Sequence, residues 1–201
     1  MSLEKPTIVI FDMDGTSVRH LSPRLLNTME QLDDTAYRVT KFFGWVFKRK
    51  GRGPILPVEE TAARQRKEPR LLVHRAIHRV RRKPVEQIVE PCPGIYPVLK
   101  FLQEKEVPMA IVSNGLGKGY GHEILKKFNF EQYFKASVFR EDIKNSKPNP
   151  EPLLLALREL GVKLKEDDVI WYIGDRHKDV TASLAAQKHL PCKIQPIAYG
   201  V

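Results

Sequence analysis

Short apolar runs that alternate with amphipathic stretches dominate the second half of this 201-residue chain. Runs of four or five apolar residues predict buried strands, and apolar residues at helical spacing predict helices between them. The expected strands are residues 7–11, 109–112, 136–139, 169–173 and 194–198, and the expected helices are residues 96–104, 121–128, 150–160 and 178–188. This alternation is typical of a parallel sheet with helices on its faces. The pattern therefore predicts an α/β fold with a sheet of about five strands.

The first expected strand stands apart from the others, because about 80 residues without a convincing strand pattern follow it. Their spacing predicts helices at residues 23–50, 59–67 and 70–83 instead. Prolines and a glycine at residues 91–94 mark the return to the alternating pattern. We therefore expect an α/β core of residues 1–16 and 92–201, interrupted by an inserted helical segment of residues 17–91.

The positive charge of the chain is concentrated in this expected insertion. The formal net charge is +10, and residues 17–91 contain 17 Lys or Arg against 8 Asp or Glu, whereas the remainder contains 17 against 16. Such a segment can bind a polyanion, such as nucleic acid or an anionic lipid surface. It can also be an ordinary solvated helical face, which is the interpretation that we favour because runs of charge usually lie on the surface.

The two cysteines and the apolar runs limit the other classes of protein. Cys92 and Cys192 lie far apart and form no metal-binding pair, so we expect reduced thiols. No stretch approaches the roughly 18 apolar residues of a membrane span, and no secretory signal pattern is present. We expect a cytoplasmic protein without a transmembrane segment, and the sequence leaves the oligomeric state open.

Polar side chains follow the carboxyl ends of the expected strands. They are Asp12 and Asp14 after the first strand, Ser113 and Asn114 after the second, Lys147 before the third helix, and Asp175 and Asp179 after the fourth strand. Because the carboxyl ends of parallel strands meet at one edge of a sheet, we expect these groups to converge. Gly15 gives the chain the freedom to bend, so that Asp12 and Asp14 can take different roles.

This combination of groups is typical of phosphoryl transfer. Negative charge spreads over the phosphoryl oxygens in that reaction, and Lys147, the Ser113 hydroxyl and nearby backbone N–H groups supply the donors that stabilise it. The carboxylates would repel a phosphate unless a hard cation offset their charge. Mg²⁺ prefers oxygen ligands and keeps several waters, which suits Asp12 and Asp175, with Asp179 close by or bound through water.

Four motifs in this order resemble those of the haloacid dehalogenase superfamily. The run of residues 12–16 resembles the first motif, residues 113–115 the second, Lys147-Pro148 the third, and Gly174-Asp175 with Asp179 the fourth. The resemblance covers residues 6 to about 190 apart from the insertion, which is similar to the helical C1 cap of phosphoglycolate phosphatase-like members. It implies a Rossmann-like core with an inserted cap.

The resemblance also implies roles for the residues. Asp12 would be the nucleophile that forms an aspartyl-phosphate, and Asp14 would protonate the leaving group and then activate water. The phosphoryl group would be held by Ser113, Asn114, Gly115 and Lys147. Mg²⁺ would be bound by Asp12, the backbone carbonyl of Asp14 and Asp175, with Asp179 orienting the site.

The expected activity is therefore Mg²⁺-dependent hydrolysis of a small phosphomonoester. Asp14 argues against the dehalogenase and phosphonatase branches of the superfamily, which usually lack an acid at that position. A phosphomutase of the same family also needs both aspartates and stays open, as does a polyanion-binding module on the same fold. Ser17 departs from the family, in which a large aliphatic residue is frequent at that position, and the sequence leaves its role open.

Overall fold

The computed structural model describes residues 3–21 and 84–200, which form one compact unit. Its strands are β1 (Ile8–Asp12), β2 (Val18–His20), β3 (Val89–Pro91), β4 (Met109–Val112), β5 (Phe134–Val138), β6 (Val169–Gly174) and β7 (Lys193–Ala198). Its α-helices are α3 (Ile95–Glu104), α4 (Lys118–Lys127), α5 (Glu151–Glu159) and α6 (His177–Gln187), with short 3₁₀ helices η2 (Val85–Gln87) and η3 (Arg140–Asp142).

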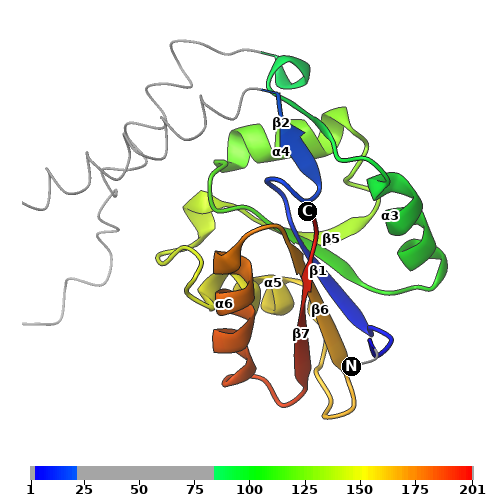
Figure 1. Cartoon of the computed structure of the whole chain (residues 1–201), viewed down its shortest axis with the longest axis vertical. Helices are drawn as coiled ribbons and strands as arrows, with labels where there is room; N and C mark the ends of the chain where they lie inside the picture. Colours follow the sequence, from blue (N-terminus) through cyan, green and yellow to red (C-terminus); the bar gives the residue numbers. More distant parts are fainter. Residues whose placement is uncertain (1–2, 22–83, 201) are drawn as a thin grey trace, which may run out of the picture. The chain divides into compact units, whose positions relative to one another are not determined.

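Five strands form one parallel sheet in the order β5-β4-β1-β6-β7. The chain runs from β1 outward to β4 and β5, and then returns to the other side of β1 through β6 and β7 (Figure 1). The expected α/β class and the parallel five-strand sheet are confirmed. The reversal of direction at β1 creates the switch point at which open α/β sheets bind ligands.

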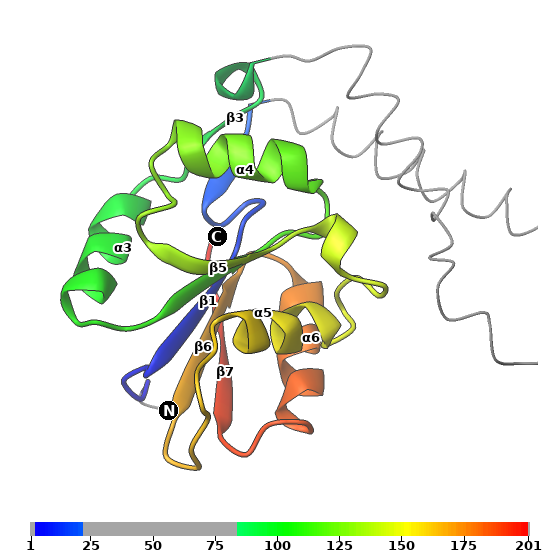
Figure 2. The same ribbon diagram turned by 180° about the vertical axis from the view of Figure 1, so that it is seen from behind.

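Helices cover both faces of this sheet. Figures 1 and 2 show α3 and α4 on one side of the strands and α5 and α6 on the other. Val9 and Phe11 of β1 pack into the apolar cluster that contains residues of α3 and α4, whereas Ile8 and Ile10 pack into the cluster that contains residues of α5 and α6. Because successive side chains of a strand point to opposite faces, a sheet covered on both sides requires an unbroken apolar run.

Two short strands that the sequence pattern did not predict form an antiparallel pair beside the core. In this β2–β3 ribbon, Val18 pairs with Pro91, Arg19 with Glu90 and His20 with Val89. No strand was expected between β1 and β4. This expectation is wrong, because β2 follows shortly after β1 and β3 lies in the stretch before β4. Three-residue strands are too short to show an alternation, so their pairing rather than their pattern defines them.

The helices predicted at residues 23–50, 59–67 and 70–83 lie outside the described residues, and so do most of the basic side chains of the expected cap. The division into a core of residues 1–16 and 92–201 and a cap of residues 17–91 stays a prediction. Both cysteines are buried free thiols, as expected. Each helix in the described part of the chain is too short or too polar to span a lipid bilayer.

Candidate active site

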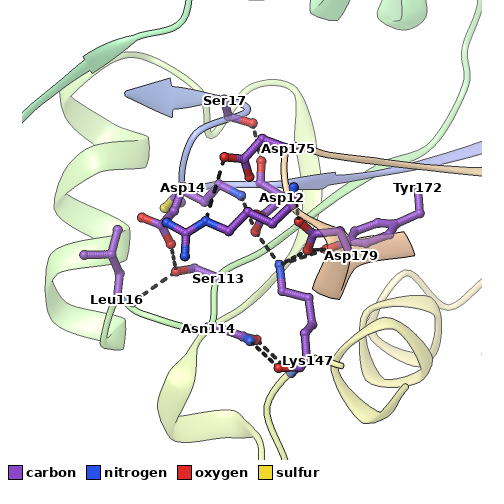
Figure 3. A network of polar contacts seen from close by, with 12 residues as sticks. Asp12, Asp14, Ser17, Ser113, Asn114, Leu116, Lys147, Tyr172, Asp175 and Asp179 are labelled. Atoms are coloured by element: carbon purple, nitrogen blue, oxygen red, sulfur yellow. Dashed lines mark hydrogen bonds and ion pairs between the residues drawn. The ribbon is translucent and has the colours of Figure 1, made fainter. Parts of the chain in front are cut away.

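The predicted site residues meet at the carboxyl edge of the parallel sheet. Asp12 is the last residue of β1, Ser113 directly follows β4 and Asp175 directly follows β6. Lys147 reaches the same place from the loop before α5, and Asp179 from the first turn of α6 (Figure 3). The residues therefore come from both sides of the switch point at β1.

Lys147 lies at the centre of one half of the site. Its Nζ is 2.6 Å from Oδ1 of Asp12, 2.7 Å from Oδ1 of Asp179 and 2.9 Å from the hydroxyl of Tyr172. The side chains of Lys147, Asp12 and Asp179 are at most 3% exposed. An ammonium group has three hydrogens to donate, so these three contacts use all of them.

The charges around Asp12 work against one another. Burial raises the pKa of Asp12, the nearby Asp179 and Asp14 raise it further, and Lys147 only partly offsets them, so that the pKa lies at about 7. For Lys147, burial opposes the charged form, but Asp12 and Asp179 outweigh it and raise the pKa. One ammonium group thus faces more negative charge than it can neutralise.

Asp14 has a different set of partners. Its Oδ1 lies 3.0 Å from Nε2 of His20, and its Oδ2 accepts a 2.7 Å hydrogen bond from the hydroxyl of Ser113. The hydroxyl oxygen of Ser113 in turn accepts a hydrogen bond from the backbone N–H of Leu116 at 3.1 Å. Burial would raise the pKa of Asp14, but the contacts with His20 and Ser113 outweigh it and hold the pKa below its ordinary value.

The two side chains expected to bind a phosphoryl group are thus engaged with the two aspartates. Lys147 contacts Asp12, and Ser113 contacts Asp14. Their donors must change partners before they can bind a phosphoryl group.

Asn114 bonds the backbone of Lys147 on both sides. Its Nδ2 donates to the carbonyl oxygen of Lys147, and its Oδ1 accepts from the N–H of Lys147, both at 3.3 Å. The amide side chain therefore ties the loop that carries the ammonium group to the end of β4. Gly115 follows in the same loop and is half-buried.

Three carboxylates lie close enough to hold one metal ion. One oxygen each of Asp12, Asp175 and Asp179 lies within 4.8 Å of the others, and Asp175 is the exposed member of the group. Burial is also the main cause of the raised pKa of Asp175. A cluster of carboxylate oxygens with excess negative charge fits a hard divalent cation. The side chain of Asp14 is directed to His20 and Ser113 instead, and a metal contact through its backbone carbonyl stays a prediction.

Two glycines allow this approach of the carboxylates. Gly15 has a φ of 87°, and a Cβ atom there would lie 2.1 Å from Oδ2 of Asp175. A Cβ atom on Gly174 would lie 2.6 Å from the Cβ of Asp179. Any side chain at either position would collide with a carboxylate residue of the site.

Three residues of the site were missed or left open by the sequence reasoning. Tyr172 donates a 3.0 Å hydrogen bond to Asp179, but its place in an apolar run indicated only a core residue. His20 lies outside the four motifs, so its contact with Asp14 was not predicted. Ser17, whose role the sequence left open, donates a 2.8 Å hydrogen bond to the backbone carbonyl of Asp12. Its hydroxyl therefore helps to hold the end of β1 in place.

A family model and several known phosphatases are similar in sequence to this chain. The family model described as haloacid dehalogenase-like hydrolase matches residues 9–190. The pyrophosphatase PpaX of Halalkalibacterium halodurans is 29% identical over 96% of this chain and 84% of its own length. A phosphorylated carbohydrates phosphatase of Thermotoga maritima is 26% identical over 77% of this chain and 70% of its own. The phosphoglycolate phosphatase of Escherichia coli is 29% identical, but over only 54% of this chain and 40% of its own length.

Solved structures show the same fold. A hydrolase of the superfamily from Ehrlichia chaffeensis superimposes with a TM-score of 0.59 at 22% identity, covering 99% of this chain and 90% of its own. CbbY from Rhodobacter sphaeroides in complex with phosphate superimposes with a TM-score of 0.58 at 18% identity, covering 96% and 87%. Hydrolases of this family generally use a divalent metal. The resemblance noted from the four motifs is confirmed: this chain belongs to the haloacid dehalogenase-like hydrolases.

Proposed function

We propose that the protein is a Mg²⁺-dependent phosphatase that hydrolyses a small phosphorylated substrate through an aspartyl-phosphate on Asp12. The observation that carries the proposal is the position of Asp12, buried at the end of β1 between the ammonium group of Lys147 and the carboxylates of Asp175 and Asp179. A carboxylate beside a lysine and a cation site is suited to attack on phosphorus.

In the proposed first step, a carboxylate oxygen of Asp12 forms a bond to phosphorus as the bond to the leaving oxygen breaks. Asp14, in its protonated form, gives its proton to that leaving oxygen. Lys147 and Ser113 exchange their present carboxylate partners for phosphoryl oxygens, and backbone N–H groups of Asn114 and Gly115 add further donors.

In the second step, Asp14 takes a proton from a water molecule that attacks the aspartyl-phosphate. The bond between phosphorus and Asp12 breaks, and inorganic phosphate and the Asp12 carboxylate are regenerated. Asp12, Asp175 and the backbone carbonyl of Asp14 would hold Mg²⁺, with Asp179 beside them. When bound, Mg²⁺ supplies positive charge that offsets the carboxylates and the phosphoryl oxygens.

The names of the relatives suggest which substrates to try. Pyrophosphate, phosphoglycolate and sugar phosphates all present a terminal phosphoryl group, and the roles proposed for the site residues all concern that group rather than the rest of the molecule. We therefore propose a phosphorylated small molecule as the substrate class.

The test is release of inorganic phosphate from these compounds with Mg²⁺ and with EDTA, comparing the wild type with Asp12→Asn. We expect release that needs Mg²⁺ and falls by at least about 10³-fold in the variant, because the nucleophile is lost. Circular dichroism would show that the variant is folded. Isomerised substrate with little free phosphate would indicate a phosphomutase instead. Absence of both reactions, with tight salt-dependent binding of nucleic acid that survives Asp12→Asn, would indicate a polyanion-binding module.

A further inference from the structure

His20 holds one oxygen of Asp14 from outside the four motifs. The residue ends β2, and its Nε2 lies 3.0 Å from Oδ1 of Asp14. The side chains of His20 and Asp14 are only 8% and 11% exposed. A buried contact of this kind is shielded from water and salt, so it restrains the carboxylate more than a surface pair would.

Ser113 holds the other oxygen. Because the Ser113 oxygen accepts from the Leu116 N–H, its single hydrogen is directed to Oδ2 of Asp14. A carboxylate that is bound at both oxygens from two different strand ends cannot rotate about its own bonds without losing one contact. In this state His20 and Ser113 together determine the orientation of Asp14, and His20 is the contact that stays with Asp14 when Ser113 turns to a phosphoryl oxygen in the proposed reaction.

The backbone holds His20 in place for this contact. His20 pairs with Val89 across the β2–β3 ribbon, and the N–H of Leu21 donates to the carbonyl of Ile88 at 2.8 Å. On the other side, Gly15 and Val18 are joined by a 2.7 Å backbone hydrogen bond. The imidazole thus projects from a hydrogen-bonded strand and contacts Asp14, which lies in the loop between β1 and that strand.

We propose that His20 is a positioning residue for Asp14, which orients the carboxylate for the proton transfers assigned to it. The inference rests on the proposed function, since it assumes that Asp14 acts as the acid and base. His20 reaches the reaction only through Asp14.

The first test is a double-mutant cycle on kcat/KM for an alkyl phosphate, whose poor leaving group needs the proton of Asp14, with the low turnover of the Asp14→Ala variants followed at high enzyme concentration. We expect His20→Leu to lower kcat/KM by about 10-fold or more in the wild-type background, since misorientation of a reacting group is costly. In the Asp14→Ala background, the same substitution should change kcat/KM by less than about 2-fold. Equal losses in the two backgrounds would overturn the proposal, because a structural role does not depend on Asp14.

The second test uses a conservative variant and a matched control. His20→Gln keeps an N–H donor of similar reach and should recover most of the activity lost in His20→Leu. Arg19→Leu alters the neighbouring residue of the same strand, whose side chain pairs with Glu90 on the surface, and should leave kcat/KM unchanged. Equal activity of His20→Gln and His20→Leu would also overturn the proposal.

A third measurement is independent of turnover. The imidazole N–H of His20 should give an exchange-protected proton resonance in the NMR spectrum, retained in Arg19→Leu and lost in Asp14→Ala. If the wild type releases no phosphate but this resonance is present, the proposed function fails and the pairing stands. If phosphate is released but the resonance is absent, or is unchanged in Asp14→Ala, the positioning role fails while the phosphatase stands.

Discussion

Asp12 and Asp14 are separated by one residue, yet they lie in opposite electrostatic environments. Asp12 shares the single ammonium group of Lys147 with Asp179, and burial raises its pKa to about 7. Asp14 is bound by His20 and Ser113, and its pKa is lowered despite its burial. Two identical side chains thus differ in their protonation because of their neighbours alone.

In the protein by itself, these shifts run opposite to the proposed roles. A nucleophile must be ionised, but the environment of Asp12 favours its neutral form, and an acid must carry a proton, but the environment of Asp14 favours the carboxylate. A cation held beside Asp12 lowers the pKa of that group, because it favours the charged form. The comparison teaches that the Asp12 half of the site depends on added positive charge, whereas the Asp14 half is satisfied by the chain's own donors.

Among the changes that test the difference between the Asp12 and Asp14 halves of the site, replacement of Asp14 should have the largest effect on kcat/KM. Asp14→Asn should lower kcat/KM for an alkyl phosphate by about 10²–10⁴-fold, because the poor leaving group needs a proton. With p-nitrophenyl phosphate the loss should be below about 10-fold. Steady-state kinetics with both esters measures the difference, and equal losses would mean that Asp14 does not act as the acid.

Mg²⁺ should change the thermal stability through the Asp12 half of the site and not through the Asp14 side chain. At 100 times its dissociation constant, Mg²⁺ should stabilise the wild type by about 2.7 kcal/mol, or about 5–10 °C in Tm. Asp175→Asn should remove most of this shift, whereas Asp14→Asn should keep it because the Asp14 side chain is directed to His20 and Ser113. Thermal unfolding with Mg²⁺ and with EDTA measures both, and a shift that Asp14→Asn abolishes would contradict the assignment.

The pH dependence of stability should have opposite signs for the two aspartates. The pKa of Asp12 is raised from 3.8 to about 7, so ionising this group costs folding stability. The cost is absent below about pH 4, grows as the pH rises, and is complete above about pH 7. In EDTA, Asp12→Asn should therefore unfold at a higher Tm than the wild type, with a gain of several degrees that grows between pH 4 and 7.

For Asp14 the pKa is lowered, so its charge contributes stability that is present at neutral pH and is lost as the pH falls through the lowered pKa. Asp14→Asn should accordingly have a lower Tm at pH 7, and this deficit should shrink in acid. Thermal unfolding of both variants from about pH 2 to pH 8 covers both windows, since the Asp12 effect develops between pH 4 and 7 and the Asp14 effect is lost only below the ordinary carboxyl value of 3.8. Two curves that move in the same direction would show that the environments do not differ as described.

Ser17 should have the smallest effect. Ser17→Ala removes the 2.8 Å hydrogen bond to the carbonyl of Asp12 and leaves that buried acceptor with one donor fewer. We expect a loss of about 1 kcal/mol, or about 2–4 °C in Tm, and a reduction in kcat of only a few-fold. A loss of activity comparable to that of Asp14→Asn would place Ser17 in the chemistry rather than in the support of β1.

The sequence predicted the parts of the site that depend on long buried strands. Residues 7–11 form an unbroken apolar run because β1 is covered on both faces, and Asp12 follows directly. The ends of elements were less accurate: α4 begins at Lys118 rather than at residue 121, since glycines at 119 and 121 obscured its first turn.

The parts that depend on tertiary pairing were not visible in the sequence. β2 and β3 have three residues each and are strands only because they pair with one another. Neither is long enough to show an alternation of apolar and polar residues. His20 and Tyr172 were missed for the same reason, because their roles come from Asp14 and Asp179, which lie close to them only through the fold. A strand-end carboxylate is conspicuous in a sequence, but its hydrogen-bond partner is not.

The β2–β3 ribbon also has a consequence for how such a chain can evolve. Residues 22–83 lie between the two stretches of the described unit, and the N–H of Leu21, which precedes this interval, donates to the carbonyl of Ile88, which follows it by five residues. The strands that flank this interval are thus held together by backbone hydrogen bonds of the described unit itself. Because the free energy of closing a loop grows only slowly with its length, we expect that sequence between these strands can be gained, lost or exchanged while the sheet keeps its strand order, which makes this point of the chain a natural graft site.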